Sequence, residues 1–265
     1  MYEFSFHRAT SLDEALKRAA AGDEAKFLAG GMTLLPTMKH RLAAPTDIID
    51  LSGIADLKGI SVDGNTVSIG AMVTHAEVAA STDVAKAIPA LSDLAGHIGD
   101  RQVRNRGTLG GSVANNDPAA DYPGAVVGLN ATVHTDRRQI AADDFFTGIF
   151  ETALEEDELV TRVAFPLPEK AAYMKFPNPA SRYAMAGVFV AKFPNGCRVA
   201  VTGAGPCVFR VPEMEQALAG GFESSRLEGI SVPAAGLSSD IHASAEYRAH
   251  LIGVMARRAV DKAAG

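Results

Sequence analysis

Two pairs of adjacent glycines, Gly30-Gly31 and Gly110-Gly111, constrain the architecture of this chain more than any other feature. Each pair follows an apolar run and precedes a predicted helix start or tight turn. A segment rich in hydroxyl, amide and carboxylate side chains, 112–121, follows the second pair. Glycine lets the main chain approach an anion closely, and successive N–H groups can then donate to that anion. Together the two pairs predict two backbone cradles for one phosphate-bearing ligand.

Either pair taken alone is more often an ordinary turn, since adjacent glycines are a common turn signal. The segment 107–112 lacks the Lys-Ser/Thr ending of a Walker loop, and the dinucleotide pattern Gly-x-Gly-x-x-Gly surrounds neither pair. The phosphate-binding interpretation therefore depends on both pairs and on the residues around them.

The pattern of apolar residues and turn signals divides the chain into three segments, 1–55, 56–166 and 167–265. The first is predicted to be a small α/β unit, because a Ser-x-x-Glu capping box at 11–14 opens a helix and Pro45 ends another. Its predicted elements are helices over 12–20 and 34–42 and strands over 26–29 and 47–51.

Hairpin signals mark the other two segments, and Pro166-Leu167-Pro168 separates them. The middle segment is predicted to hold a hairpin over 60–69 around Asp63-Gly64-Asn65, a capping box at 74–77 and a strand over 131–134. The C-terminal segment is predicted to be an antiparallel sheet with helices. Its elements are strands over 184–193 and 197–202, joined at Pro194-Asn195-Gly196, and helices over 211–218 and 244–260, with Ser244 as N-cap.

The charge balance argues against nonspecific nucleic-acid binding, since the 265 residues carry a formal net charge of -6. The only tight basic cluster is Arg101, Arg104 and Arg106. It is typical of a solvated loop or a subunit-facing patch, and it is equally compatible with a role beside phosphates. The N-terminus lacks the apolar stretch of a signal peptide, and no run of about eighteen apolar residues occurs. We therefore expect a cytoplasmic protein without a membrane span.

Other candidate functional groups have simpler structural explanations. Cys197 and Cys207 cannot form an iron–sulfur site by themselves and have no zinc-type spacing with histidine. No two histidines stand at a metal-ligand spacing on a helix, so His75 is interpreted as part of a helix start and His97 as a helix-end residue. The acidic pairs at Asp143-Asp144 and 155–158 are typical of a solvated face. Neither Ser112 nor Ser181 has a nucleophile-elbow setting.

Two longer motifs are far more specific than the glycine pairs alone. Ala29-Gly30-Gly31-x-Thr33-Leu34-Leu35-Pro36 and Arg101-Gln102-x-Arg104-Asn105-x-Gly107-Thr108-Leu109-Gly110-Gly111-Ser112 resemble the FAD-binding medium subunit of the molybdenum hydroxylases, the xanthine dehydrogenase and carbon monoxide dehydrogenase family. The resemblance covers essentially the whole chain. It implies an α+β fold of the p-cresol methylhydroxylase/vanillyl-alcohol oxidase type. Two α/β subdomains, 1–55 and 56–166, cradle FAD there, and a C-terminal α+β domain, 167–265, adds an antiparallel sheet with helices.

The resemblance also implies which residues contact FAD. Both glycine motifs bind the pyrophosphate and ribose, Asp121 contacts the sugar chain, and Val160 makes a backbone contact. The segments 173–176 and 181–188 pass the flavin ring, which puts Lys175 and Tyr183 near it. The implied FAD-binding set is Lys26, Phe27, Leu28, Ala29, Gly30, Gly31, Met32, Thr33, Leu34, Thr108, Leu109, Gly110, Gly111, Ser112, Asn115, Asp117, Asp121, Val160, Lys175 and Tyr183.

One departure from the family pattern is Met32, where relatives more often carry Gln or His, and this affects only a side-chain contact. A second is that no cysteine cluster interrupts the flavin-binding segments, so we expect this chain to bind FAD alone and no metal.

The implied function is electron transfer within a complex. A molybdenum-bearing large subunit oxidises or hydroxylates a substrate, a small subunit with 2Fe-2S clusters relays the electrons, and FAD passes them to an external acceptor. The implied assembly is a dimer of heterotrimers. Two alternatives remain open, namely a self-sufficient small flavin oxidoreductase and an assembly module that keeps the fold but has lost FAD. The substrate and the final acceptor cannot be deduced from this chain.

Overall fold

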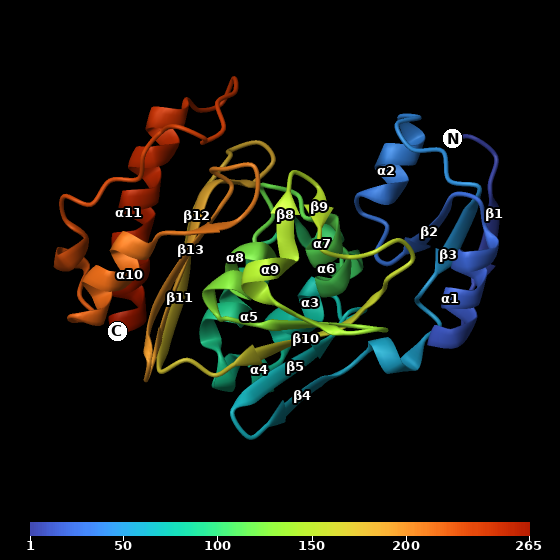
Figure 1. Cartoon of the computed structure of the whole chain (residues 1–265), viewed down its shortest axis with the longest axis horizontal. Helices are drawn as coiled ribbons and strands as arrows, with labels where there is room; N and C mark the ends of the chain where they lie inside the picture. Colours follow the sequence, from blue (N-terminus) through green and yellow to red (C-terminus); the bar gives the residue numbers. More distant parts are fainter.

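The chain folds into three modules that follow one another along the longest axis of the molecule (Figure 1). A computed structural model describes all 265 residues. The N-terminal module lies at one end, a middle module of short helices and strands lies at the centre, and the C-terminal sheet with its long helix lies at the other end. No helix combines the length and the apolar character needed to cross a membrane.

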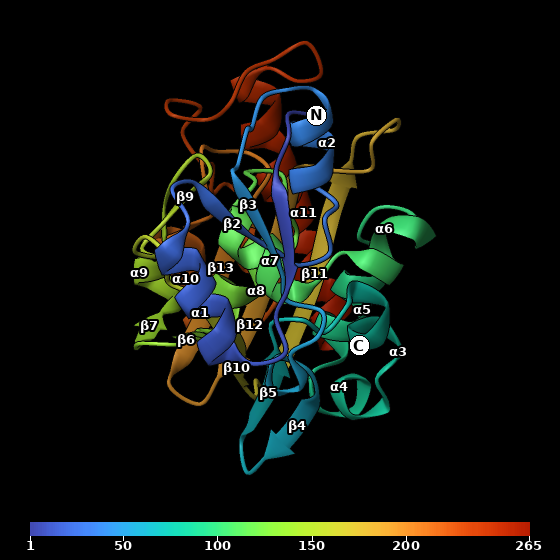
Figure 2. The same ribbon diagram turned by 90° about the vertical axis from the view of Figure 1, so that its right-hand side faces the viewer.

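The N-terminal module is a parallel three-stranded sheet in the order β1-β3-β2. Figure 2 views the molecule from this end, with the three strands in front. Its elements are β1 (Ser5–Arg8), α1 (Leu12–Ala21), β2 (Ala25–Leu28), α2 (Leu34–Lys39), β3 (Asp47–Asp50) and the 3-10 helix η1 (Ala55–Leu57).

Two details of this module differ from the sequence prediction. Ser11 caps α1 by accepting a hydrogen bond from the backbone N–H of Glu14, but the reciprocal bond of a capping box does not form. The Glu14 carboxylate accepts from the N–H of Thr10 instead. Helix α2 ends at Lys39 and not at Leu42, because Arg41 takes the left-handed conformation (φ 60°) that terminates helices.

The middle module is built on a five-stranded antiparallel sheet in the order β4-β5-β10-β6-β7. The predicted hairpin over 60–69 is confirmed, and the capping box of Thr74 with Glu77 forms both of its bonds. The elements are β4 (Ile60–Asp63), β5 (Thr66–Gly70), α3 (His75–Ala80), α4 (Thr82–Ala87), α5 (Pro89–Gly96), α6 (Arg101–Arg106), α7 (Leu109–Asn115), α8 (Tyr122–Gly128), β6 (Thr132–Thr135), β7 (Gln139–Ala141), α9 (Ala142–Phe145), β8 (Phe146–Gly148), β9 (Glu151–Thr152) and β10 (Val160–Pro166).

The C-terminal module is a four-stranded antiparallel sheet in the order β11-β12-β13-β14, as the hairpin signals predict. The N-cap at Ser244 is confirmed, and the last helix runs past Val260 to Ala264. The elements are β11 (Lys170–Pro177), β12 (Ala184–Phe193), β13 (Gly196–Thr202), β14 (Phe209–Arg210), α10 (Pro212–Ala219), the 3-10 helix η2 (Ser224–Leu227) and α11 (Ala245–Ala264).

This last sheet is buried on both faces, which explains the nearly continuous apolar run of β12. Tyr173 and Phe189 belong to the same hydrophobic core as the helices of the middle module. Val188 and Val190 face the opposite way and pack with α10 and α11. The middle and C-terminal modules therefore share a core, whereas the N-terminal module has a smaller core that Met72 and Leu159 of the middle module join.

Polar contacts also join the middle and C-terminal modules. Asp143, predicted on a solvated face, accepts hydrogen bonds from Arg198 and Arg210 of the C-terminal sheet. The guanidinium of Arg198 also donates to the carbonyl of Val127 at 2.8 Å. Asp143 itself is exposed, as predicted for a solvated face, but its two arginine partners lie far along the chain and only folding brings them to it.

Candidate functional site

A cavity of about 1030 Å³ lies where the N-terminal and middle modules meet. Its volume is at the upper end of the range that small-molecule sites in proteins occupy. The N-terminal module contributes the strand β2 and the loop that follows it, up to Leu34. The other walls come from the segments 98–121 and 150–160, and from Ser181–Tyr183 of the C-terminal module.

Both glycine pairs lie on this cavity, and they lie against each other. A Cβ atom on Gly30 would stand 2.0 Å from the carbonyl oxygen of Arg106 and 2.8 Å from the Cα atom of Gly107. A Cβ atom on Gly111 would stand 3.2 Å from that of Ala29. Glycine at Gly30 is therefore what allows the two segments to approach so closely.

The loop after β2 presents a continuous set of free hydrogen-bond donors. Every backbone N–H from Ala29 to Leu34 is without a hydrogen-bond partner in the chain, and all six residues line the cavity. Gly31 takes a left-handed conformation (φ 74°), which bends the loop between its neighbours. Successive N–H groups in a bent loop form an anion-binding concavity. This loop therefore fits the pyrophosphate of a dinucleotide.

The second glycine pair does something different from what its sequence predicts. The N–H groups of Leu109, Gly110 and Gly111 donate to the Val73 carbonyl, the Ala71 carbonyl and the Thr108 hydroxyl, at 3.0, 2.9 and 3.1 Å. The expectation of a second backbone cradle is thus wrong, because these donors are already satisfied by the packing of α7 on the segment after β5. Gly110 permits that packing, since a Cβ atom there would stand 2.4 Å from the Ala71 side chain.

The unpaired donors on this wall are the N–H of Thr108 and two side chains. The Ser112 hydroxyl and the Asn115 amide line the cavity and make no hydrogen bond within the chain. Both are available to a polar ligand.

Asp121, just before α8, is the one predicted carboxylate that is deeply buried at the cavity, with an exposed fraction of 6%. Its Oδ1 atom accepts a hydrogen bond from the Tyr173 hydroxyl at 2.5 Å, and its Oδ2 atom lies 3.0 Å from the Lys175 ammonium. Lys175 also donates to the carbonyl of His97 at 2.9 Å. Burial raises the pKa of Asp121, and the charge of Lys175 and the Tyr173 hydrogen bond oppose that rise.

Two residues of the predicted FAD-binding set do not line the cavity. Leu109 is fully buried in the core of the middle module. The Lys175 side chain is also buried, and its ammonium pairs with the Asp121 carboxylate at 3.0 Å. The structure brings together the other members, which are Lys26, Phe27, Leu28, Ala29, Gly30, Gly31, Met32, Thr33, Leu34, Thr108, Gly110, Gly111, Ser112, Asn115, Asp117, Asp121, Val160 and Tyr183.

The basic cluster at Arg101, Arg104 and Arg106 does not line the cavity either. Arg104 instead donates two hydrogen bonds, to the carbonyls of Ile98 and Gly99, which shape the wall from behind. The sequence left open a solvated or subunit-facing patch and a role beside phosphates. The structure favours the first of these, since Arg101 and Arg106 are exposed.

His75 is a cavity residue that sequence reasoning assigned only to a helix start. It is the first residue of α3, as predicted, but its ring also lies in the wall, packed beside Gly107. Burial, together with the charge of Arg104, lowers the pKa of His75 to about 4. The ring is therefore neutral at pH 7 and adds no charge to the cavity.

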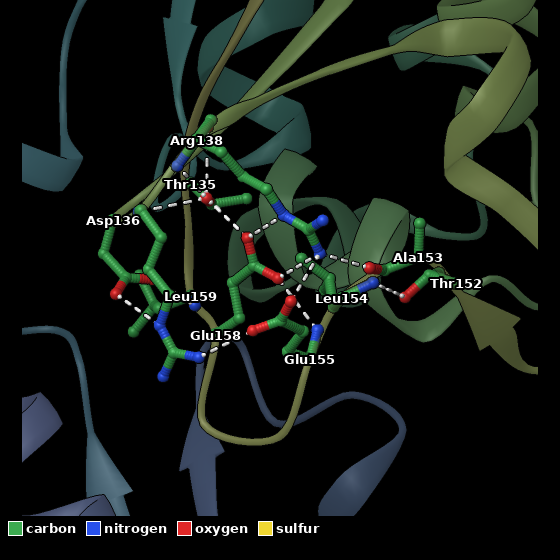
Figure 3. A network of polar contacts seen from close by, with 10 residues as sticks. Thr135, Asp136, Arg138, Thr152, Ala153, Leu154, Glu155, Glu158 and Leu159 are labelled. Atoms are coloured by element: carbon green, nitrogen blue, oxygen red, sulfur yellow. Dashed lines mark hydrogen bonds and ion pairs between the residues drawn. The ribbon is translucent and has the colours of Figure 1, made fainter.

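The acidic run 155–158 also lines the cavity. Glu155 and Glu156 are exposed, as predicted for a solvated face, whereas Glu158 is buried, against that prediction. Figure 3 shows how it is held. The Glu158 side chain is fully buried and accepts hydrogen bonds from the guanidinium of Arg138 at 2.9 and 2.8 Å. It also accepts from the Thr135 hydroxyl at 2.7 Å and from the N–H of Glu155 at 2.8 Å. These bonds, the Arg138 pair first, lower the pKa of Glu158 to about 2.

We expect Glu158→Gln to destabilise the protein by about 1–3 kcal/mol at pH 7, because the ion pair with Arg138 is lost. The loss stays within this range because Arg138 is partly exposed and solvent screens its charge. Folding lowers the pKa of Glu158 from 4.5, its value in the unfolded chain, to about 2. The ionised Glu158 therefore stabilises the fold above pH 4.5, and this stabilisation is lost as the pH falls toward 2. Urea unfolding at pH 7 and at pH 3–5 measures both effects. The neighbouring Glu156→Gln is the control, and an equal loss in both variants contradicts the assignment.

Comparison with known proteins matches both parts of the chain. Residues 2–168 match the family described as "FAD binding domain in molybdopterin dehydrogenase", and residues 171–263 match "CO dehydrogenase flavoprotein C-terminal domain". The nicotine 6-hydroxylase medium subunit of Paenarthrobacter nicotinovorans is 38% identical, over 96% of this chain and 94% of its own. The carbon monoxide dehydrogenase medium chain of Hydrogenophaga pseudoflava is 33% identical, over 98% and 96%.

A solved structure shows the same architecture. Quinoline 2-oxidoreductase from Pseudomonas putida 86 superposes with a TM-score of 0.89 at 30% identity, covering 99% of this chain and 97% of that one. The predicted α+β fold class is thereby confirmed, and so is FAD as the cofactor. The free N–H groups of Ala29–Leu34 and the size of the cavity fit that cofactor. The chain belongs to the family of FAD-binding medium subunits of the molybdenum hydroxylases, which are oxidoreductase complexes.

Proposed function

We propose that this chain carries electrons from the iron–sulfur clusters of a partner subunit through FAD to an external acceptor. The observation that carries the proposal is the loop Ala29–Leu34, which lines one large cavity between two modules and whose backbone N–H groups have no partner in the chain. Bound FAD supplies reversible redox chemistry, and the protein supplies binding, orientation and electrostatics.

Within this proposal the cavity holds FAD along its length. The amides of Ala29–Leu34 compensate the charge of the pyrophosphate, and Ser112 and Asn115 add side-chain donors from the opposite wall. The remaining lone pairs of Asp121 accept from hydroxyls of the sugar chain. Tyr183, half exposed at the wall, covers the flavin ring.

The surroundings of the ring end control its charge and hydration. Ile98 and Phe150 contribute apolar side chains to the cavity lining. Asp121 and Lys175 form a buried ion pair, so this wall carries little net charge. Lys175 would therefore act on the flavin through Asp121, and not by direct contact.

The domain limits 1–55, 56–166 and 167–265 belong to the same proposal. The five-stranded sheet of the middle module closes with β10, which ends at Pro166, and the next strand starts the C-terminal sheet at Lys170. The cavity would thus lie between the first two domains, with the third contributing Tyr183.

The assembly is proposed by analogy with the relatives, whose names describe medium subunits of nicotine 6-hydroxylase and carbon monoxide dehydrogenase. The partners would be a small subunit with 2Fe-2S clusters and a large subunit with the molybdenum cofactor, as a dimer of heterotrimers. The cytoplasmic location and the lack of nucleic-acid binding stay predictions of the sequence.

The test is the visible absorption spectrum of the purified chain, followed by heat release and identification of the chromophore. We expect a yellow protein that releases FAD, and co-expression with the two partner subunits should give an oxidoreductase whose flavin is reduced by the substrate of the complex. A flavin that a soluble donor reduces at a useful turnover in the isolated chain would favour the self-sufficient enzyme. Colourless protein, both alone and in the co-expressed complex, would favour the module that has lost FAD.

A further inference from the structure

Tyr173 stands outside the cavity wall and outside the implied FAD-binding set, yet it touches the cavity's buried carboxylate. We infer that Tyr173 is a positioning residue, whose hydroxyl orients the Asp121 carboxylate for the sugar-chain hydroxyls of FAD. The inference rests on the proposed function, because it concerns the same site.

The contact is specific and buried. Tyr173 lies on β11 with an exposed fraction of 3%, and its hydroxyl donates to Asp121 Oδ1 at 2.5 Å. Gly187 stands nearby on the neighbouring strand β12, where a Cβ atom would lie 2.3 Å from the Tyr173 hydroxyl oxygen. A side chain at Gly187 would displace the hydroxyl, so the sheet leaves room at this point for the bond to Asp121.

The C-terminal sheet also holds the backbone that leads to Asp121. The Thr202 hydroxyl donates to the carbonyl of Ala120 at 2.6 Å. The N–H of Gly203 donates to the carbonyl of Pro118 at 2.8 Å. The sheet therefore holds the segment 117–121, of which Asp117, Ala120 and Asp121 line the cavity. This ties one wall of the cavity, which belongs to the middle module, to the C-terminal module.

Each oxygen of Asp121 has one partner from β11, since Tyr173 binds Oδ1 and Lys175 binds Oδ2. Two bonds from one strand fix the plane of the carboxylate. Each oxygen keeps a further lone pair for a ligand hydroxyl. Lys175 balances the charge of Asp121, whereas the neutral Tyr173 hydroxyl contributes direction.

The experiment compares Tyr173→Phe with Tyr122→Phe in the full-length chain, using FAD as the probe. Both changes remove one buried hydroxyl, but that of Tyr122 has no hydrogen-bond partner and does not line the cavity. We expect Tyr173→Phe to weaken FAD binding about ten- to a hundredfold, the range for a hydrogen bond to a charged group. Tyr122→Phe should leave the affinity unchanged.

The pH dependence of FAD binding provides the readout that a merely structural role would not move. The Tyr173 hydroxyl helps to keep Asp121 ionised, so removing that hydroxyl raises the pKa of Asp121. As the pH is lowered, Tyr173→Phe should therefore lose FAD at a higher pH than the wild type does. The other ionisable groups around Asp121 are Lys175, His97, Asp117, Tyr183 and Tyr122. Tyr173→Phe leaves all five in place, and Tyr122→Phe removes only the Tyr122 hydroxyl, which is neutral at the pH of the titration because burial and the charge of Asp121 raise its pKa.

Gly187→Ala is the second variant, because it displaces the Tyr173 hydroxyl without removing it. It should weaken FAD binding and raise the acid midpoint, which is the pH at which half of the FAD binding is lost on acidification. This test remains available if Tyr173→Phe does not fold. Equal affinities and midpoints in the Tyr173, Gly187 and Tyr122 variants would overturn the inference, as would weaker binding without a shifted midpoint. A wild-type chain that binds no FAD, alone or in its complex, would instead overturn the proposed function.

Discussion

Replacing Gly30 with alanine should reduce the affinity for FAD by at least about a hundredfold, or about 2.7 kcal/mol. The added methyl group would lie 2.0 Å from the carbonyl oxygen of Arg106. That oxygen and the Cα atom of Gly107 belong to the backbone at the end of α6, so they cannot rotate away as a side chain could. The loop Ala29–Leu34 must then withdraw from the middle module, and its free N–H groups move away from their ligand.

The measurement is the flavin content of the purified variant, together with titration of its FAD-free form. Gly253→Ala is the matched control, because a Cβ atom there, in the middle of α11, meets no atom closer than 3.8 Å. The control should bind FAD normally and gain about 0.5–1 kcal/mol of stability, as expected for alanine in a helix. Full flavin retention in a folded Gly30→Ala variant would show that the two modules can separate without harm to the site.

Asp121→Asn should lower the free energy of unfolding of the FAD-free chain by about 3–5 kcal/mol at pH 7. The change leaves the Lys175 ammonium buried, with a side-chain exposure of 8%, and without its counter-ion. The carbonyl of His97 and a neutral amide oxygen would remain as its partners, and neither balances its charge. A buried charge without compensation costs more than the pair itself contributes. Urea unfolding at pH 7 measures this loss.

The double variant Asp121→Asn, Lys175→Met separates charge from shape. Removing both charges should restore most of the stability, because neither group is then buried uncompensated. FAD binding should not recover, since the ionised acceptor for the sugar chain is still missing. Asp13→Asn, which breaks only the exposed pair with Lys17, should have little effect. A double variant as unstable as Asp121→Asn would mean that Asp121 matters for something other than the charge of Lys175.

The sequence predicted best those elements whose signals are local and long. The hairpin of β12 and β13 combines two apolar runs with Asn195-Gly196 at the turn, and α11 combines an N-cap with a sustained period. The helices α4–α8 gave no such signal, because each has only six to eight residues and several are rich in glycine and alanine. Tertiary packing stabilises such short helices, so periodicity cannot reveal them.

The candidate site shows the same division. The glycine pairs predicted a phosphate-bearing ligand, since glycine marks close backbone approach from the sequence alone. The resemblance of the motifs around them implied FAD and the family. Which N–H groups remain free was decided by folding, because Val73, Ala71 and Thr108 satisfy those of the second pair while nothing satisfies those of Ala29–Leu34.

The charges followed the same rule, since their roles depend on partners that are distant in the sequence. The buried Glu158 pairs with Arg138, and Lys175 on β11 pairs with Asp121 just before α8, and in both pairs the partners are far apart in the sequence. The amino-acid sequence by itself determined the modules, the hairpins and the ligand class, all of which depend on local conformation. Only the tertiary structure decided which donors and charges face that ligand, because burial and pairing are properties of surfaces that meet in space.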